Sequence, residues 1–243
     1  MPIIKLNAID STNSYLRALN VEVKVDDYTT VVTKLQTNGR GQMGTVWNSE
    51  ASKNLTFSVF KDVSQIYIEY PFYISIATSL AILKTLQGFN IPKLSVKWPN
   101  DILSENKKIC GILIENVIKQ NNLYASIIGV GLNVNQAKFN NLPKASSLIA
   151  ITGTVYNLDE ILKAILLNLK GYFLELENGN LKTLKDEYEN YLFRKNKPST
   201  FKNAKGLVFS GFIKAISNSG NLQVLLEDDI IKEFDLKDIS LLY

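Results

Sequence analysis

Glycine, amide and cationic residues lie close together between Gln36 and Gly44, and Trp47 follows shortly after. Glycines let a backbone curve closely around a ligand, and successive amide N–H groups can bind an anion. Arg40 adds a permanent positive charge on a planar group that matches a carboxylate or a phosphate. The glycine spacing is neither that of a P-loop nor that of a dinucleotide fingerprint. Alone, this segment indicates either an anion-binding loop or an ordinary glycine-rich loop with an exposed arginine.

Two further segments combine polar residues with the end of an apolar run. The first, Lys97 to Asp101, has the sequence Lys-Trp-Pro-Asn-Asp, and the second, Gly129 to Asn135, is rich in glycine and asparagine. The first would place an amide and a carboxylate at a rigid turn. Proline, asparagine and aspartate also favour turns for purely local reasons. Each segment is therefore compatible with a polar site or with simple turn chemistry.

The fourth segment, Lys107 to Glu115, is an apolar run that begins with two lysines. A lysine that enters an apolar strand can be partly desolvated, and its charge then acts strongly on a nearby anion. We expect this of Lys108, whereas Lys107 has the character of a solvated hairpin tip. Cys110 lies within the apolar run, which indicates a buried small hydrophobic residue and not a nucleophile.

Absent residue types narrow the possible chemistry further. The chain of 243 residues has no histidine and one cysteine, which excludes histidine-dependent triads, histidine-ligated metals and an internal disulfide. Positioning and charge neutralisation of an already reactive substrate remain possible. The formal net charge of +4 is too small to indicate a nucleic-acid partner by itself. The single cysteine and the lack of a signal peptide or long apolar segment predict a cytoplasmic protein with no membrane association.

Hydrophobic periodicity predicts the elements that position these segments. Predicted strands span residues 29–35, 55–60, 94–98, 102–103, 109–117 and 123–131. One predicted helix follows the capping residues at 11–14, and three others span residues 70–87, 158–178 and 181–195. Shorter runs at 206–213, 222–226 and 230–234 predict a small β module after a linker at 195–198. The fold class is therefore α/β, with an α/β domain at 1–197 and a β-barrel-like domain at 198–243.

Taken together, five motifs resemble those of biotin–protein ligases in both order and spacing. They are Ser11-Thr12-Asn13, Gly39-Arg40-Gly41, Lys97-Trp98-Pro99-Asn100-Asp101, Lys108-x-x-Gly111-Ile112-Leu113-x-Glu115 and Gly129-x-Gly131-x-Asn133. The Lys-Trp-Pro-Asn-Asp run is highly specific, and the resemblance covers nearly the whole chain.

The resemblance implies a fold and a two-step reaction. The fold is a mixed sheet with flanking helices, similar to the core of class II aminoacyl-tRNA synthetases, followed by an SH3-like β-barrel domain. In the first step the biotin carboxylate attacks the α-phosphate of MgATP to form biotinyl-5′-AMP. In the second, a lysine of a biotin carboxyl carrier protein or domain takes the biotinyl group. Biotin and MgATP are substrates, and no tightly bound cofactor is expected.

By position, the resemblance also implies roles for individual residues. The biotin site comprises Ser11, Thr12, Asn13, Gln36, Gly39, Arg40, Gly41, Gln42, Lys108, Gly111 and Gly129. The nucleotide site comprises Arg40, Trp47, Asn100, Asp101, Lys108 and Asn133. Lys108 and Arg40 are the expected catalytic residues: Lys108 would neutralise carboxylate and phosphate oxygens, and Arg40 lies in the loop that closes over the adenylate. The resemblance does not indicate which residues ligand Mg²⁺.

Two departures from the family pattern change what we expect. Gln42 occupies a position where many members have a second arginine, so the loop has less charge with which to bind phosphate. Ser11-Thr12-Asn13 lies ten residues from the start of the sequence, which predicts no helix-turn-helix domain and no specific DNA binding. Both monomers and homodimers occur in the family, and the oligomeric state stays open.

Two alternatives remain at this point. A lipoate–protein ligase or octanoyltransferase would have the same fold, but the Lys-Trp-Pro-Asn-Asp run and the Gly-Arg-Gly loop argue against it. A non-enzymatic nucleic-acid-binding protein would explain the basic stretch from Arg194 to Lys205, which also fits a solvated linker.

Overall fold

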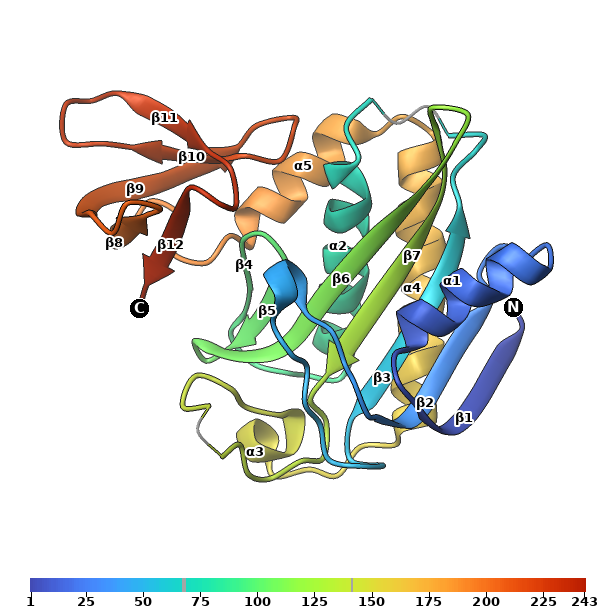
Figure 1. Cartoon of the computed structure of the whole chain (residues 1–243). Coiled ribbons are helices and arrows are strands. Elements are labelled where there is room, and N and C mark those ends of the chain that lie inside the picture. Colours follow the sequence, from blue (N-terminus) through green and yellow to red (C-terminus); the bar gives the residue numbers. More distant parts are fainter. Residues whose placement is uncertain (67–68, 141) are drawn as a thin grey trace.

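The computed structural model of the chain describes residues 1–66, 69–140 and 142–243 (Figure 1). Its centre is a seven-stranded sheet with the strand order β1-β2-β3-β7-β6-β5-β4. These strands are β1 (Ile3–Ile9), β2 (Thr30–Gln36), β3 (Leu55–Asp62), β4 (Leu94–Lys97), β5 (Asp101–Ser104), β6 (Lys107–Lys119) and β7 (Asn122–Leu132). The β1–β2 pair is parallel and the other pairs are antiparallel, so the sheet is mixed, as the family resemblance implies.

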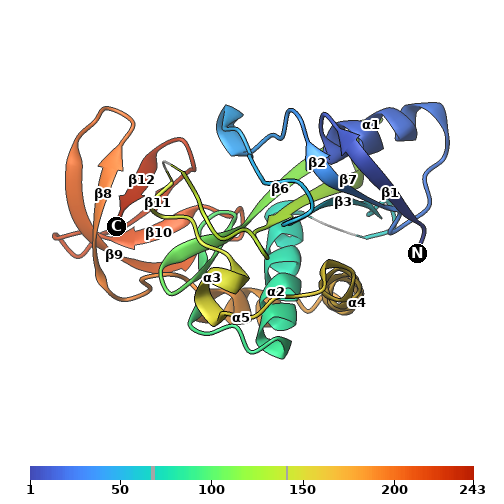
Figure 2. The same ribbon diagram turned by 90° about the horizontal axis from the view of Figure 1, so that it is seen from below.

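Helices cover both faces of this sheet (Figures 1 and 2). They are α1 (Thr12–Glu22), α2 (Phe72–Gly88), α3 (Leu148–Thr152), α4 (Leu158–Glu177) and α5 (Leu181–Asn190). Helices α2 and α4 pack together on one face, and α1 lies on the other. Because α2 packs against the sheet and has α4 and α5 beside it, it is buried on most sides, which explains why its sequence is apolar with little periodicity.

Two hydrophobic cores follow from these layers. The larger one joins the sheet to α2, α4 and α5, and includes Phe57, Leu83 and Phe173. The smaller one lies under α1, between Leu16 and Phe60. Helix α1 begins at Thr12 and is capped by Ser11, whose hydroxyl accepts a hydrogen bond from the Ser14 amide. The N-cap therefore lies within the run of capping residues that the sequence contains.

The C-terminal segment forms a separate five-stranded antiparallel sheet with the order β11-β10-β9-β8-β12. Its strands are β8 (Pro198–Asn203), β9 (Val208–Ile216), β10 (Leu222–Leu225), β11 (Ile231–Phe234) and β12 (Ile239–Leu242). The predicted β module is present as this open sheet, in which β11 and β12 are the two edges. Strands β8 and β12 were not predicted. We call residues 198–243 the tail.

The segment between α5 and the tail is firmly attached. Helix α5 ends at Asn190, so the prediction of a helix to residue 195 is wrong. The chain instead passes through turns beside β4, where the Val96 amide donates to the Tyr191 carbonyl at 2.7 Å and the Phe193 amide donates to the Val96 carbonyl at 2.8 Å. The Asn196 amide then donates to Ile213 of β9. The predicted linker is therefore hydrogen-bonded to the tail.

The tail also contacts the main sheet directly. The Trp98 indole N–H donates to the Gly220 carbonyl at 2.8 Å. Gly220 has φ +94°, and a Cβ there would lie 2.3 Å from the Phe72 ring at the start of α2. Glycine is therefore required at this contact. Among the helices of the described residues, none has the length and apolar character that a membrane crossing requires.

Candidate active site

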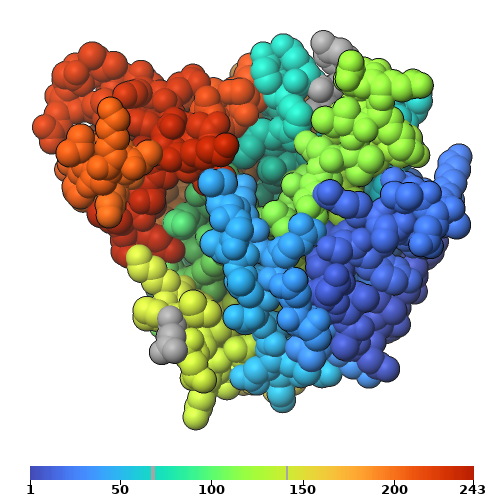
Figure 3. Space-filling view, viewed as in Figure 1, coloured from blue at the N-terminus to red at the C-terminus, as the bar shows by residue number. Residues whose placement is uncertain are grey.

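A cavity of about 700 Å³ opens between the main sheet, the 36–48 loop and the tail. Figure 3 shows the hollow between the blue loop, the green strands and the red tail. Its lining includes nearly all of the predicted site residues: Ser11, Thr12, Asn13, Gln36, Arg40, Gly41, Gln42, Trp47, Asn100, Asp101, Lys108, Gly111, Gly129 and Asn133. Gly39 is the one predicted residue outside this lining. The structure thus brings residues from five separate motifs to one place.

At one end of the cavity, buried hydroxyl and amide groups form a closed network. The Gln36 side-chain oxygen accepts from the Thr12 amide at 2.8 Å and from the Thr12 hydroxyl at 3.1 Å. The Ser58 hydroxyl lies 2.7 Å from that of Thr12 and donates to the Asn13 side-chain oxygen at 2.5 Å. A Cβ at Gly129 would lie 2.4 Å from the same Asn13 oxygen. We call Thr12, Asn13, Gln36 and Ser58 the amide end.

Glu115 connects this network to the glycine-rich loop. One of its oxygens accepts from the Asn13 amide group at 2.8 Å. Arg40 binds both carboxylate oxygens, at 3.2 and 2.9 Å, and Arg17 binds one of them at 2.8 Å. Glu115 belongs to the recognised motif, but the sequence analysis predicts no role for it. In this structure the Arg40 charge is therefore already paired.

The glycine-rich loop folds into a tight turn. The Gly41 amide donates to the Thr45 carbonyl at 2.7 Å, and Met43 and Gly44 have φ values of 55° and 77°. The Gln42 carbonyl accepts from the Thr45 hydroxyl at 2.8 Å. A Cβ at Gly39 would lie 2.3 Å from the Trp47 carbonyl, so Gly39 acts by allowing close approach of the backbone.

Trp47 lies flat against two glycines of the central strands. A Cβ at Gly131 would lie 2.3 Å from the indole, and a Cβ at Gly111 would lie 3.0 Å from it. The indole N–H is buried and makes no hydrogen bond within the described residues. A buried donor without an acceptor is costly, so this face of the cavity favours a ligand that supplies one.

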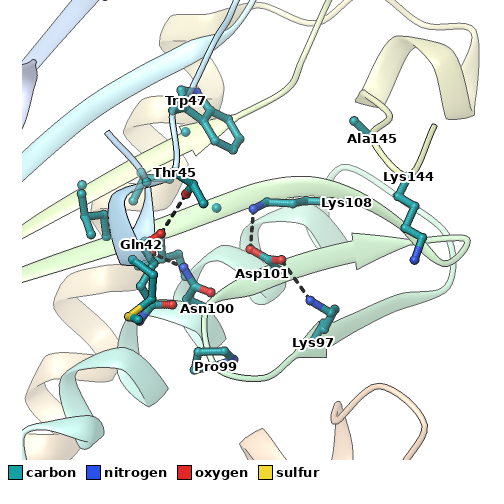
Figure 4. A pocket seen from close by; sticks show the side chains of 18 of the residues that line it. Gln42, Thr45, Trp47, Lys97, Pro99, Asn100, Asp101, Lys108, Lys144 and Ala145 are labelled. Atoms are coloured by element: carbon teal, nitrogen blue, oxygen red, sulfur yellow. Dashed lines mark hydrogen bonds and ion pairs between the residues drawn. The ribbon is translucent and has the colours of Figure 1, made fainter. Parts of the chain in front are cut away.

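Figure 4 shows the opposite end of the cavity, where Asp101 lies between two lysines. The Lys108 ammonium is 2.6 Å from one Asp101 oxygen, and the Lys97 ammonium is 3.6 Å from the other. Lys144 is next to Lys108, whose backbone amide donates to the Lys144 carbonyl at 2.7 Å. We call Lys97, Asp101, Lys108 and Lys144 the lysine end.

Two predicted nucleotide residues bond to the backbone. The Asn100 amide group donates to the Ile112 carbonyl at 2.8 Å, and that of Asn133 donates to the Ser146 carbonyl at 3.0 Å. These bonds fix the turn before β5 and the segment after β7, both of which line the cavity. In this structure Asn100 and Asn133 therefore shape the walls.

The only cysteine is inert in this setting. Cys110 is fully buried, is absent from the cavity lining, and has a thiol whose pKa is raised by that burial. Within the described residues there is also no group of three or more acidic or cysteine side chains that could bind a metal ion. The cavity therefore offers neither a thiolate nor a preformed metal centre.

Residues of the tail that no sequence pattern predicts complete the lining of the cavity. They include Phe201, Ile213, Leu222, Leu241 and Tyr243. The Tyr243 ring lies 5.1 Å from that of Phe193, and burial together with the Asp101 charge raises the pKa of its phenol. No local pattern marks these residues, because their position depends on how the tail packs.

Comparison with known proteins identifies the class. A sequence profile of the Biotin/lipoate A/B protein ligase family matches residues 6–133, more than half of the chain. The chain therefore belongs to this family.

Individual relatives narrow the comparison. The bifunctional ligase/repressor BirA of Escherichia coli is 29% identical over 97% of this chain, which corresponds to 73% of that protein. The biotin--[acetyl-CoA-carboxylase] ligase of Mycobacterium tuberculosis is 30% identical over 70% of this chain and 63% of that protein. Among solved structures, biotin protein ligase from Aquifex aeolicus in complex with biotin and ATP superposes with a TM-score of 0.83 at 27% identity, covering 99% of this chain and 98% of that one.

Proposed function

We propose that this chain is a biotin–protein ligase that forms biotinyl-5′-AMP from biotin and MgATP and transfers the biotinyl group to a lysine of a biotin carboxyl carrier protein or domain. The observation that supports this best is that the two ends of this cavity differ: one is rich in buried amide and hydroxyl groups and the other is rich in lysine. Biotin itself has a polar ureido head and a distant carboxylate. The family and its biotin- and ATP-bound relative agree with that match.

The amide end suits the ureido head of biotin. The head has one acceptor and two N–H donors, and Thr12, Asn13 and Gln36, which line the cavity, offer both kinds of group, with Ser58 bonded behind them. Their mutual hydrogen bonds fix them before the ligand arrives, so less conformational freedom is lost on binding. Gly129 leaves room for the Asn13 side chain in this position.

The lysine end suits the reaction itself. A biotin carboxylate oxygen attacks the α-phosphorus of ATP, the bond from that phosphorus to the bridging oxygen breaks, and pyrophosphate leaves with the electron pair. Two anions must approach each other, and their repulsion rises as water is excluded. Lys108 reduces that repulsion, while Asp101 orients the Lys108 ammonium through its 2.6 Å contact. Mg²⁺ enters as part of the MgATP substrate.

The second step needs no enzyme nucleophile. The neutral amine of the carrier lysine attacks the acyl carbon, the carbon–oxygen bond to AMP breaks, and the nitrogen loses a proton. The cavity is open at the junction between the loop and the tail, which gives an extended lysine a route to the acyl group (Figure 3). The single cysteine fits a reducing compartment, and we propose that the reaction takes place in the cytoplasm.

In this scheme Trp47 covers the adenine, and Arg40 contacts the adenylate after leaving Glu115. Arg40 can exchange Glu115 for the adenylate because its side chain is 41% exposed. The buried Trp47 indole N–H has no acceptor in this structure and can gain one from the ligand. Gln42 lines the same cavity without adding charge. Asn100 and Asn133 act through the walls that they hydrogen-bond.

Of the alternatives, acyl transfer through the cysteine fits poorly, because Cys110 does not reach the cavity. A nucleic-acid-binding role also has little support. Much of the basic stretch from Arg194 to Lys205 lies in the turn before β8 and in β8 itself. Arg194 there is hydrogen-bonded to Ser199.

The test incubates the full chain with MgATP and equal amounts of biotin, lipoate and octanoate, and identifies acyl-adenylates by mass spectrometry. We expect biotinyl-AMP to dominate, and the biotinyl group to appear on a carrier domain once one is added. Lipoyl-AMP or octanoyl-AMP without biotinyl-AMP would contradict the proposal.

A further inference from the structure

The lysine end has more positive charge than its carboxylate can neutralise. Asp101 is the only acidic side chain among the described residues that line the cavity, against Arg40, Lys97, Lys108 and Lys144. Arg40 is paired with Glu115, which leaves three lysines and one carboxylate. Partly desolvated like charges repel one another, so this arrangement favours an anion with several negative charges.

An aromatic ring positions two of these lysines. The Lys144 ammonium lies 4.1 Å from the centroid of the Tyr243 ring, and the Lys97 ammonium lies 5.5 Å from it. Phe193 packs edge-on against Tyr243 at 5.1 Å and fixes the ring. A cation–π contact restrains an ammonium without cancelling its charge, whereas a carboxylate would do both. Lys144 therefore stays available to an anion, while Lys97 shares the single Asp101 carboxylate with Lys108 and keeps part of its charge unneutralised.

We infer that Lys97 and Lys144, positioned by Tyr243, bind the β- and γ-phosphates of ATP, the part of the substrate that leaves as pyrophosphate. This inference rests on the ATP-dependent activity proposed above. Lys97 lies on the far side of Asp101 from Lys108 (Figure 4). The pyrophosphate subsite therefore adjoins the lysine at which carboxylate and α-phosphate meet.

The position of this subsite has a chemical purpose. When the bond from the α-phosphorus to the bridging oxygen breaks, negative charge accumulates on the departing pyrophosphate. Fixed cations at that point stabilise the transition state and retain the triphosphate before reaction. Tyr243 is a positioning residue in this scheme, because it acts through the lysines.

The decisive variant is Lys144→Gln, since Lys144 is exposed and its loss should not disturb the fold. In the full chain we expect the KM for ATP to rise about tenfold, the scale of one charge-assisted hydrogen bond. The inhibition constant of pyrophosphate should rise equally. The KM for biotin and the inhibition constant of AMP, which lacks the β- and γ-phosphates, should stay within about twofold of wild type.

Tyr243 provides the second arm. Tyr243→Leu removes the ring and should raise the KM for ATP severalfold. Tyr243→Phe keeps the ring and should restore most of the affinity. A matched control is Lys119→Gln, because Lys119 makes the same kind of contact, 3.8 Å from the Tyr124 ring, at the other end of β6. This control should leave every constant unchanged.

Titration of magnesium pyrophosphate into the full chain by calorimetry separates this inference from the proposed function. Binding that weakens about tenfold in Lys144→Gln supports the subsite even if wild type fails to make biotinyl-AMP. Equal pyrophosphate affinity in wild type and Lys144→Gln would overturn it. A loss of AMP affinity as large as that of pyrophosphate would also overturn it, because the lysine would then contact the adenylate portion.

Discussion

The two ends of the cavity differ in how their polar groups are satisfied. At the amide end, Thr12, Asn13, Gln36 and Ser58 bond to one another, with Glu115 completing the set. At the lysine end, one carboxylate is shared by the Lys97 and Lys108 ammonium groups, and Lys144 has no acidic partner among the described residues. The first region is arranged before the ligand binds. The second is arranged to exchange partners, which suits a site where charge moves.

Lys108→Ala should break the lysine end with the largest effect. Loss of the cation where carboxylate and phosphate meet should slow biotinyl-AMP formation about 100-fold or more. Lys107→Ala is the matched control, because Lys107 is exposed at the same hairpin. Single-turnover rates give the result, with circular dichroism to confirm folding. Equal rates in both variants would remove Lys108 from the mechanism.

Gly129→Ala should break the amide end instead. The added Cβ would lie 2.4 Å from the Asn13 oxygen, so Asn13 must move away from Ser58. Overpacking of this kind costs about 1–3 kcal/mol, which predicts a rise of tenfold or more in the KM for biotin with the KM for ATP nearly unchanged. Gly171→Ala, in α4 with open space around it, is the control. A rise confined to the KM for ATP would contradict the assignment of the two ends.

Part of each end could be predicted from the sequence. Thr12, Lys108 and Asp101 belong to the family motifs and Gln36 to the glycine-rich segment, and all four line the cavity. The strands and helices around them follow from periodicity, apart from the edge strands β1 and β12 and the inner tail strand β8. The pairing of these strands depends on residues that are distant in the sequence, so their own residues give an incomplete signal.

Residues that act through tertiary contacts escaped prediction. Glu115 meets Asn13 and Arg40 from positions 102 and 75 residues away in the chain. Tyr243 reaches Lys97 and Lys144 only because the tail packs against β4 and its turn. Neither contact has a local signature.

Gln42→Arg would sharpen the comparison by adding a cation to the loop above the lysine end. A guanidinium can make a charge-assisted contact to the adenylate phosphate, roughly twice as strong as a neutral hydrogen bond. Release of labelled biotinyl-AMP from a preformed complex should therefore slow by about fivefold, while transfer to the carrier persists. Unchanged or faster release would show that the side chain at position 42 does not reach the phosphate.

Cys110→Ala should have the smallest effect on activity. The thiol is buried with a raised pKa, so it stays protonated and outside the cavity. We expect adenylation and transfer within about twofold of wild type, and a loss of about 1 kcal/mol in the free energy of unfolding from the small void. Chemical denaturation and transfer assays measure the two quantities. A variant that folds but cannot transfer the acyl group would point to a thioester route.

The central claim is that biotin is activated by direct attack of its carboxylate on the α-phosphate of ATP. Biotin labelled with ¹⁸O at both carboxylate oxygens tests this most directly, with mass spectrometry of AMP, pyrophosphate and phosphate after transfer to a carrier domain. The account predicts one ¹⁸O atom in each AMP released and none in pyrophosphate. Label in inorganic phosphate, or its absence from AMP, would contradict the account.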